Sequence, residues 1–402
     1  TVGWDAARIT PELDAVIVGM HARADNPELI RAQELKLPVY SYPEYLYEQT
    51  RQKKRIVIGG SHGKTTITSM ILHVMAHAGQ QPDFMVGAQL EGFECMVRLS
   101  QDAPYAVLEG DEYLSSPIDR RPKFHLYHPD IALLSGIAWD HINVFPTFEN
   151  YLDQFRIFIS LIQPGGSLVY AADDPWVNAL ATEAGVVAQL LPYHVPAYIV
   201  ENGQAILTTG RGDVPLQVFG KHNLQNLEGA RLVCQQAGID GDTFYQAIQS
   251  FKGASRRLEL VTGHASGKMF RDFAHSPSKL KATTAALREA YPNRKLVACM
   301  ELHTFSSLND HFLDEYANTM EVADLAFVYF NPHTVEHKKL PSIDPERVKR
   351  AFASPHVEVF TDSKALTERL RSYGWENVNL LMMSSGNFDG IDFPTLGKEL
   401  FG

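Results

Sequence analysis

Short apolar runs alternate with amphipathic stretches along the first part of the chain. The runs that read as buried strands cover residues 14–19, 38–41, 55–58, 106–108 and 131–134. Between and after them, spaced apolar residues predict helices, among them one from about Lys64 to His77 and one from Asn223 to Gly238. This alternation indicates an α/β fold, in which parallel strands present their carboxyl ends to a ligand.

A second α/β series follows the segment 251–256, which reads as a boundary. Its expected strands cover residues 269–270, 295–299, 325–329, 357–360 and 379–383. We therefore predict a Rossmann-like N-terminal domain over 1–53, a central domain over 54–254 and a Rossmann-like C-terminal domain over 255–402. We expect the first domain to be incomplete, because the chain opens in mid-pattern without an initiator Met or a first βα unit.

Composition and charge narrow the class of protein. Of the 402 residues, 45% are hydrophobic and 21% charged, as in globular proteins, and the net charge of −11 argues against binding nucleic acid. Cys95, Cys234 and Cys299 form no Cys-x-x-Cys pair, so neither a zinc knuckle nor a disulfide framework is expected. Apolar runs stay far below the ~20 residues of a membrane span and no signal peptide opens the chain, which predicts a cytoplasmic protein without a membrane partner. The oligomeric state stays open.

Residues 59–66 carry a candidate phosphate-binding loop. They read Gly-Gly-Ser-His-Gly-Lys-Thr-Thr, between an expected strand and the helix that begins near Lys64. Glycines let the backbone approach a phosphate, the helix N-terminus adds positive potential, Lys64 supplies an ammonium, and a Thr hydroxyl can bind Mg²⁺. The spacing is the short G-x-x-G-K-T, since a full Walker motif would need glycine in place of Ile58. We favour nucleotide binding over an ordinary glycine turn.

Four motifs, in this order, resemble those of the Mur ligase family. The loop 59–66 resembles its phosphate loop, and Glu-Gly-Asp-Glu-Tyr at 109–113 resembles its E-A-D-E block. Asp140-His141 resembles its D-H block, and Gly-Lys-His-Asn-Leu-Gln-Asn at 220–226 resembles its G-x-H-N-x-x-N block. The resemblance implies the three-domain Mur ligase architecture, with a UDP-binding N-terminal domain, a central P-loop ATPase domain and a C-terminal ligase domain. It also implies ATP and Mg²⁺ as cofactors.

The resemblance further implies roles for residues around the nucleotide. ATP would contact the loop residues Gly60, His62, Gly63, Lys64, Thr65 and Thr66, with its base near Asn223 and Asn226 and its ribose or base region near Asp272. Thr65 and Glu109 offer the oxygen donors that Mg²⁺ prefers, and the resemblance adds His141 for a second ion. Arg257 would reach the γ-phosphate on domain closure, so Lys64, His141 and Arg257 are the expected catalytic residues. Each residue also has a purely structural alternative: a helix cap for Asn223 and Asn226, a loop cap for Glu109, a structural histidine for His141 and a surface arginine for Arg257.

Other predictions concern the substrates. His21, Arg23 and Asn26 lie in a segment that resembles the family's second uridine-side loop, while the first glycine-rich loop would be expected upstream. Arg120 and Lys123 lie in the stretch Asp-Arg-Arg-Pro-Lys-Phe at 119–124. His275, His303 and Asn387 lie in C-terminal segments that would face the incoming amine, although a tight turn alone would also explain Asn387. Asp111 and Glu112 are expected to cap the loop or position substrate rather than to bind metal.

Two activities compete within the resemblance. One joins UDP-N-acetylmuramate to L-alanine, and the other joins it to the tripeptide L-alanyl-γ-D-glutamyl-meso-diaminopimelate in peptidoglycan recycling. Tyr113 and the stretch 119–124 resemble the recycling branch, while residues 301–307 lack the arginines of the H-R-Y-T-R motif usual in the alanine branch. Residues 151–156 lack the modifiable Lys of branches that add later residues. We favour the recycling branch.

The expected chemistry is phosphorylation of the lactyl carboxylate by ATP, followed by attack of the amine on the acyl phosphate. A folylpolyglutamate-synthase-like ligase shares the loop style, but the missing Lys and the stretch 119–124 count against it. A nucleotide-binding regulator without ligase chemistry is the alternative from another class. It would leave Glu109, His141 and Arg257 unexplained.

Overall fold

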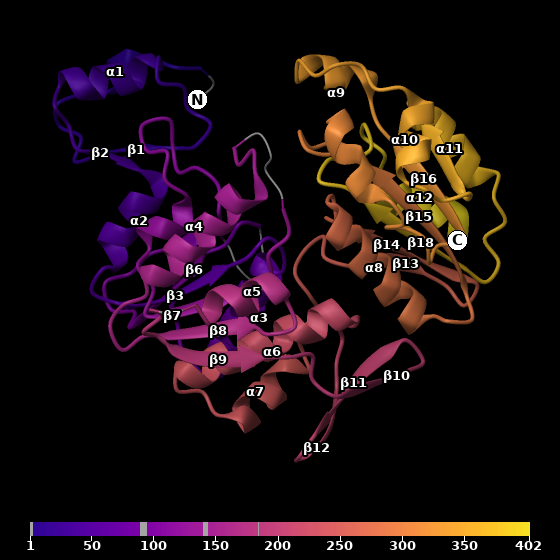
Figure 1. Ribbon diagram of the computed structural model, residues 1–402, viewed down its shortest axis with the longest axis horizontal. Helices are drawn as coiled ribbons and strands as arrows, with labels where there is room; N and C mark the ends of the chain where they lie inside the picture. The colour runs from indigo at the N-terminus through magenta and orange to yellow at the C-terminus, as the bar shows by residue number, and fades with distance from the viewer. Residues whose placement is uncertain (1–2, 89–94, 140–143, 184) are drawn as a thin grey trace.

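The computed structural model describes residues 3–88, 95–139, 144–183 and 185–402, and its architecture is α/β, as predicted (Figure 1). The N-terminal part pairs β1 with β2 in parallel and packs helices beside them. Its elements are η1 Ala6–Arg8, β1 Val16–Val18, α1 Pro27–Glu34, β2 Val39–Ser41 and α2 Tyr42–Thr50. A reciprocal pair of hydrogen bonds between Ser41 and Glu44 begins α2, because side chains there satisfy backbone N–H groups that lack helical partners.

The central sheet positions the phosphate loop. Its strand order is β5-β4-β6-β3-β7-β8-β9, with every neighbouring pair parallel except β4 with β5. The strands are β3 Lys54–Gly59, β4 Asp83–Met85, β5 Val97–Arg98, β6 Tyr105–Glu109, β7 Ile131–Leu134, β8 Ser167–Ala171 and β9 Gln189–Tyr193. The predicted strands at 55–58, 106–108 and 131–134 are confirmed as β3, β6 and β7, which lie side by side and end at one edge. Loops that follow these three strands therefore meet.

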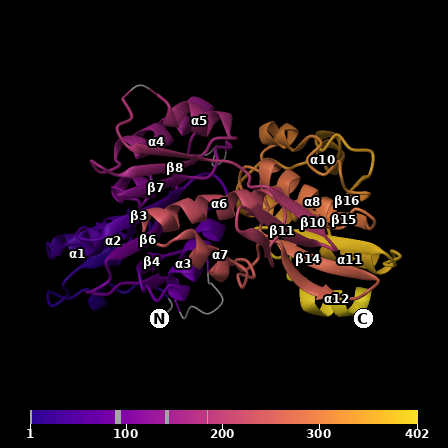
Figure 2. The ribbon, with the colours of Figure 1, turned by 90° about the horizontal axis from the view of Figure 1, so that it is seen from below.

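Helices cover both faces of the central sheet (Figure 2). The helices are α3 Lys64–His77, α4 Phe148–Ser160, α5 Pro175–Ala181, α6 Lys221–Gln236 and α7 Gly241–Ile248, with the short η2 Lys123–Leu126. The prediction of an amphipathic helix from Lys64 to His77 is right in its bounds but underestimates its burial. Helix α3 is buried on nearly every side, because α6 and α7 pack against it from the face opposite the sheet.

The C-terminal sheet has the strand order β13-β14-β18-β15-β16-β17, parallel except for β13. Its strands are β13 Glu259–Gly263, β14 Gly267–Asp272, β15 Lys295–Glu301, β16 Leu325–Tyr329, β17 Val357–Phe360 and β18 Val378–Met383. The surrounding helices are α8 Pro277–Ala290, η3 Asp310–Tyr316, α9 Pro332–His337, α10 Pro345–Ala351, α11 Ser363–Arg371 and α12 Phe393–Phe401. The predicted strands of this half are all confirmed. The predicted boundary at 53/54 falls between β2 and β3, and the one at 254/255 falls between the central and C-terminal sheets. The division into domains stays a prediction.

A small antiparallel sheet between the two large ones was not predicted (Figure 1). It consists of β10 Tyr198–Glu201, β11 Gln204–Thr209 and β12 Gly212–Pro215. The turn between β10 and β11 is Asn202-Gly203, with φ of 51° and 81°, a dipeptide typical of tight hairpins. Tyr198 donates a hydrogen bond to Glu289 of α8 at 2.7 Å, so this sheet contacts the C-terminal half. In the described part of the chain, no helix combines the length and apolarity that crossing a membrane requires.

Candidate active site

A cavity of about 1220 Å³ lies where the central sheet's loops face α8. Its walls come from the N-terminal part, the phosphate loop, the segment after β6, the start of α6, and the C-terminal half. Twelve of the residues predicted from the sequence line it: His21, His62, Gly63, Lys64, Thr65, Thr66, Glu109, Asn223, Asn226, Arg257, Asp272 and His275. Residues from distant parts of the chain are thus brought together in one cavity.

The phosphate loop depends on glycine at two positions. Gly60 has a φ of 129°, and a Cβ there would lie 2.2 Å from Ser135 Oγ. Gly63 begins α3 with a φ of 81°, and a Cβ there would lie 2.5 Å from Asn226 Oδ1. Both the backbone conformation and the space exclude larger residues. The loop is therefore packed tightly between the segment after β7 and helix α6.

Lys64 is held by oxygen atoms at the loop's centre. Its ammonium donates to Gly60 O at 2.7 Å and to Glu112 Oε2 at 2.6 Å, and it lies 3.9 Å from Asp111 Oδ1. Burial alone would lower the pKa of Lys64, but Glu112 and Asp111 outweigh burial and raise it. The side chain therefore stays charged in the buried loop, where it can turn to an incoming phosphate.

Thr65 and Glu109, the two residues expected to offer oxygen donors to Mg²⁺, are in direct contact. Thr65 Oγ1 donates to Glu109 Oε1 at 2.8 Å, and Gly87 N donates to Glu109 Oε2 at 2.7 Å. Burial and the neighbouring Asp111 raise the pKa of Glu109. A hydroxyl and a carboxylate in contact beside a phosphate loop fit Mg²⁺, which prefers oxygen donors and takes further oxygens from phosphates and water.

His141, the other predicted metal ligand, lies outside the described residues, as does Asp140. Among the residues that the structure describes, no group of three or more His, Cys, Asp and Glu side chains could hold a metal ion.

Tyr151 belongs to the part of the site that the sequence did not predict, and it contacts Glu112, which we expected to cap the loop or position substrate. Glu112 accepts from Lys64, and its other oxygen accepts from the Tyr151 hydroxyl at 3.1 Å. That hydroxyl also lies 2.8 Å from Ser61 Oγ in the phosphate loop. Glu112 was visible in the motif, but Tyr151 comes from α4, and only the fold places this helix against the loop.

Arg257 faces the cavity from the segment between the two halves. Its guanidinium stacks 4.6 Å from the centre of the Phe273 ring. Burial lowers the pKa of Arg257, while Asp272 and Glu109 act in the opposite direction. Asp272 accepts hydrogen bonds from Leu258 N and Ala274 N, both at 2.6 Å, so its carboxylate also fixes the backbone directly after Arg257 and directly after Phe273.

The start of α6 forms the cavity's opposite end. Asn223 Nδ2 donates to Phe219 O at 2.9 Å, and Asn226 packs against Gly63. Both side chains thus join α6 to neighbouring loops while they line the cavity. His222, between them and Gly220, also lines the cavity, and among the described residues its Nδ1 has no hydrogen-bond partner.

His222 gives a pH-dependent prediction. Burial lowers the pKa of His222 from its ordinary value of 6.5 to about 4. The unfolded chain therefore binds this proton at a higher pH than the folded protein, so protonation costs stability, at most about 3 kcal/mol, as pH falls from 6.5 to 4. We expect the melting temperature of the wild type to fall more steeply over this range than that of His222→Gln. Parallel curves from thermal scans at pH 4 to 7.5 would contradict the prediction.

Several predicted residues lie outside the cavity lining, and their substrate roles stay predictions. Asn26 is buried and caps α1 by accepting from Glu28 N and Leu29 N. Asn387 accepts from Gly390 N in a turn, and His303 lies 3.7 Å from Glu301. Arg23 is paired with Asp25 at the surface, Arg120 is exposed, and Lys123 contacts Asp111. Gly60 does not line the cavity, but its carbonyl oxygen accepts a hydrogen bond from Lys64.

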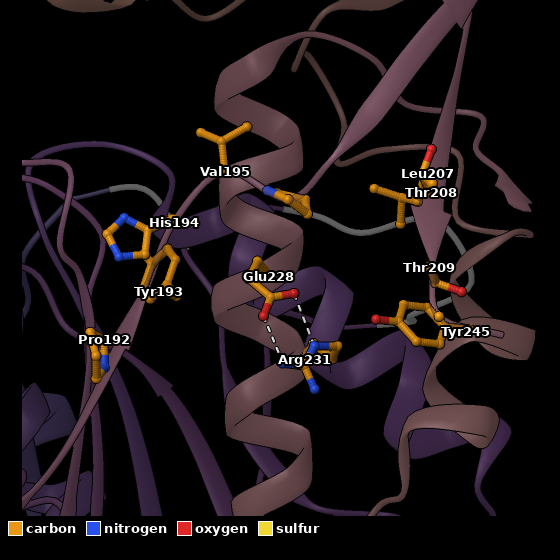
Figure 3. A pocket seen from close by; sticks show the side chains of 12 residues that line it. Pro192, Tyr193, His194, Val195, Leu207, Thr208, Thr209, Glu228, Arg231 and Tyr245 are labelled. Carbon is orange, nitrogen blue, oxygen red and sulfur yellow. Dashed lines mark hydrogen bonds and ion pairs between the residues drawn. The ribbon is translucent and has the colours of Figure 1, made fainter. Parts of the chain in front are cut away.

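A smaller cavity of about 410 Å³ lies between the end of β9, β11, α6 and α7 (Figure 3). Its charged side chains, Glu228 and Arg231, are paired with each other at 2.6 Å. His194 at its rim contacts Asp173. None of the residues predicted from the sequence line it, whereas twelve of them line the larger cavity.

Comparisons with known proteins point to one family. A model of the Mur ligase middle domain matches residues 58–234, and a model of the Mur ligase, glutamate ligase domain matches residues 256–386. The UDP-N-acetylmuramate–L-alanine ligase of Dechloromonas aromatica (strain RCB) is 30% identical over 97% of this chain and 87% of its own length. The structure of a murein peptide ligase from Psychrobacter arcticus shares the fold, with 20% identity, a TM-score of 0.65, and coverage of 99% of this chain and 88% of its own.

A further solved structure is UDP-N-acetylmuramate:L-alanyl-γ-D-glutamyl-meso-diaminopimelate ligase from Neisseria meningitides. It is 25% identical to this chain, with a TM-score of 0.57. The match covers 63% of this chain and 84% of the Neisseria chain. Ligases with two different acceptors are thus similar to this protein.

Proposed function

The chain belongs to the Mur ligase family, and from that premise we propose that it joins UDP-N-acetylmuramate to L-alanyl-γ-D-glutamyl-meso-diaminopimelate. Members of this family are ATP-dependent ligases that form amide bonds, and this chain is one of them. The proposal for the substrates is supported by the cavity, whose lining includes Lys64, Thr65 and Glu109 as well as Arg257 and His275. A carboxylate, a triphosphate and an amine could meet there.

The first step transfers the γ-phosphoryl group of ATP to the lactyl carboxylate. Lys64 and the N–H groups at the start of α3 would hold the phosphates, and Arg257 would approach from the other wall. Mg²⁺, held by Thr65 and Glu109, would offset the charge on the phosphates. A carboxylate oxygen attacks the phosphorus, the bond to ADP breaks, and an acyl phosphate forms.

The second step forms the amide. The acceptor's amine attacks the acyl carbon, the C–O bond to phosphate breaks, and phosphate and a proton are released. His275 and Lys279, both in the cavity lining, lie at the start of α8 on the side from which the acceptor would enter. Enclosure between the two halves would limit attack by water on the acyl phosphate.

Two observations favour the tripeptide as acceptor. The stretch 119–124, which resembles the recycling branch, folds back onto the segment after β6 and places Lys123 against Asp111. At the carboxyl end of β15, residues 301–307 carry no arginine to hold the carboxylate of a single amino acid. A specific observation also favours L-alanine, namely the 30% identity to an L-alanine ligase, so this activity is the second candidate.

The acceptor assay decides between these candidates. Purified protein, ATP, Mg²⁺ and UDP-N-acetylmuramate are mixed with either the tripeptide or L-alanine, and ADP release is followed by a coupled assay. We expect kcat/KM for the tripeptide to exceed that for L-alanine by about 100-fold or more, because an acceptor site built for several polar groups discriminates strongly against a ligand that lacks them. Preference for L-alanine would select the second candidate. Equal ADP release from ATP alone would contradict ligase activity altogether.

A further inference from the structure

Lys123 is a cation behind the cavity wall rather than in its lining. Only 9% of its side chain is exposed, and its ammonium lies 3.0 Å from Asp111 Oδ2. The same ammonium lies 4.4 Å from the centre of the Tyr113 ring, which favours a positive charge on its face. Asp111 itself lines the cavity. Lys123 therefore does not line the cavity itself but contacts Asp111, whose carboxylate does.

The backbone holds this pair in place. Lys123 N donates to Tyr113 O at 3.0 Å, and Phe124 N donates to Asp111 O at 3.1 Å. Leu114 and Pro122 form an antiparallel bridge, so the segment after β6 and the segment before η2 pair side by side. The intervening turn is closed by Ser115 and Ser116, which bond residues 121 and 119. The chain between them is shaped to bring Lys123 to Asp111.

Asp111 is shared between two lysines. One of its oxygens contacts Lys123 at 3.0 Å and the other lies 3.9 Å from Lys64. Burial alone would raise the pKa of Asp111, but Lys64 and Lys123 lower it more, so the carboxylate stays ionised. Three acidic side chains, Glu109, Asp111 and Glu112, line the cavity beside the phosphate loop.

The balance of carboxylates and ammonium groups beside the phosphate loop links Lys123 to ATP binding. With Lys123 present, the three carboxylates face two ammonium groups. Without it, Asp111 would have Lys64 as its nearest cation, and one more uncompensated negative charge would face the phosphates. Both effects weaken ATP binding, because uncompensated charges interact strongly where water is excluded.

We propose that Lys123 is a positioning residue that acts through Asp111, engaging this carboxylate so that Lys64 is available to the phosphates of ATP. The inference rests on the proposed function only in that ATP binds the larger cavity, whichever acceptor the enzyme uses. Lys123 would thus contribute to the nucleotide site rather than contact a substrate itself.

The test is a double-mutant cycle on ATP affinity, measured by calorimetry with ATP and Mg²⁺ and without the acid substrate. Lys123→Met keeps the packing beside Tyr113 and should weaken ATP binding about tenfold. In an Asp111→Asn background, the same substitution should change affinity by less than about twofold, since no carboxylate remains to engage. Lys123→Gln serves the same comparison if the Met variant does not purify as a folded protein.

Arg121→Met is the matched control. Arg121 lies in the same turn and carries the same charge, but its side chain is 60% exposed and paired with Asp119. ATP affinity should be unchanged in this variant. Wild-type affinity in Lys123→Met, or an equal loss in both backgrounds, would overturn the proposal. Because no acceptor is present, these results are independent of which amine the enzyme uses, and a failed acceptor assay would leave them standing.

Discussion

The Lys64→Met variant should release ADP at no more than about a thousandth of the wild-type rate under saturating substrates. Lys64 is the cation at the centre of the phosphate loop, 2.7 Å from Gly60 O and 2.6 Å from Glu112. Its charge would be needed most when negative charge redistributes over the transferring phosphoryl group. Methionine fills similar space without a charge, so the loop should fold while the chemistry fails. The coupled ADP assay measures the loss.

Lys54→Met is the control for this substitution. Lys54 begins β3, the strand that leads into the phosphate loop, and its side chain is exposed at the opposite end from the cavity. Its rate should stay within about twofold of wild type, because an exposed charge far from the site contributes little. An active Lys64→Met variant would remove Lys64 from the mechanism and would favour a different group as the phosphate's partner.

The fold was predictable where local pattern and parallel pairing agree. Apolar runs located β3, β6 and β7, and parallel strands bring their carboxyl ends to one edge. The contact of Thr65 with Glu109 follows from that edge, since Thr65 lies in the first turn of the helix after β3 and Glu109 ends β6. Such contacts need only the order of the strands.

Contacts that depend on loop shape were not predictable in the same way. The acidic motif at 109–113 was recognised, but the turn after β6 decides that Glu112 faces Lys64 while Asp111 faces Lys123. Tyr151 reaches the loop only because α4 packs against the sheet, a long-range arrangement that no local pattern encodes. Local signals were present for Asn26, followed by Pro27, which is typical of a helix cap, and for the Asn202-Gly203 turn.

Arg257→Met should lower kcat by about 100- to 1000-fold, with little change in the KM for the sugar nucleotide. In the described part of the chain, the guanidinium forms no ion pair within 4 Å. It stacks on the Phe273 ring and donates to Arg256 O at 3.3 Å. Because burial lowers its pKa, the charged form is incompletely compensated by its surroundings. A cation in this state gains most from an anion that enters the cavity, as the γ-phosphoryl group would.

Two further variants separate the role of Arg257 from general effects of charge. Arg257→Lys keeps the charge but loses the planar fork, and it should retain more activity than the Met variant while remaining about tenfold below wild type. Arg256→Met removes the charge of the neighbouring arginine, whose side chain is exposed. This variant should leave kcat within about twofold of wild type. Equal losses at positions 256 and 257 would mean that the segment needs positive charge rather than a placed guanidinium. A loss confined to Arg257 and expressed in kcat would place its action in the transfer step, where phosphoryl charge develops between the two walls of the cavity.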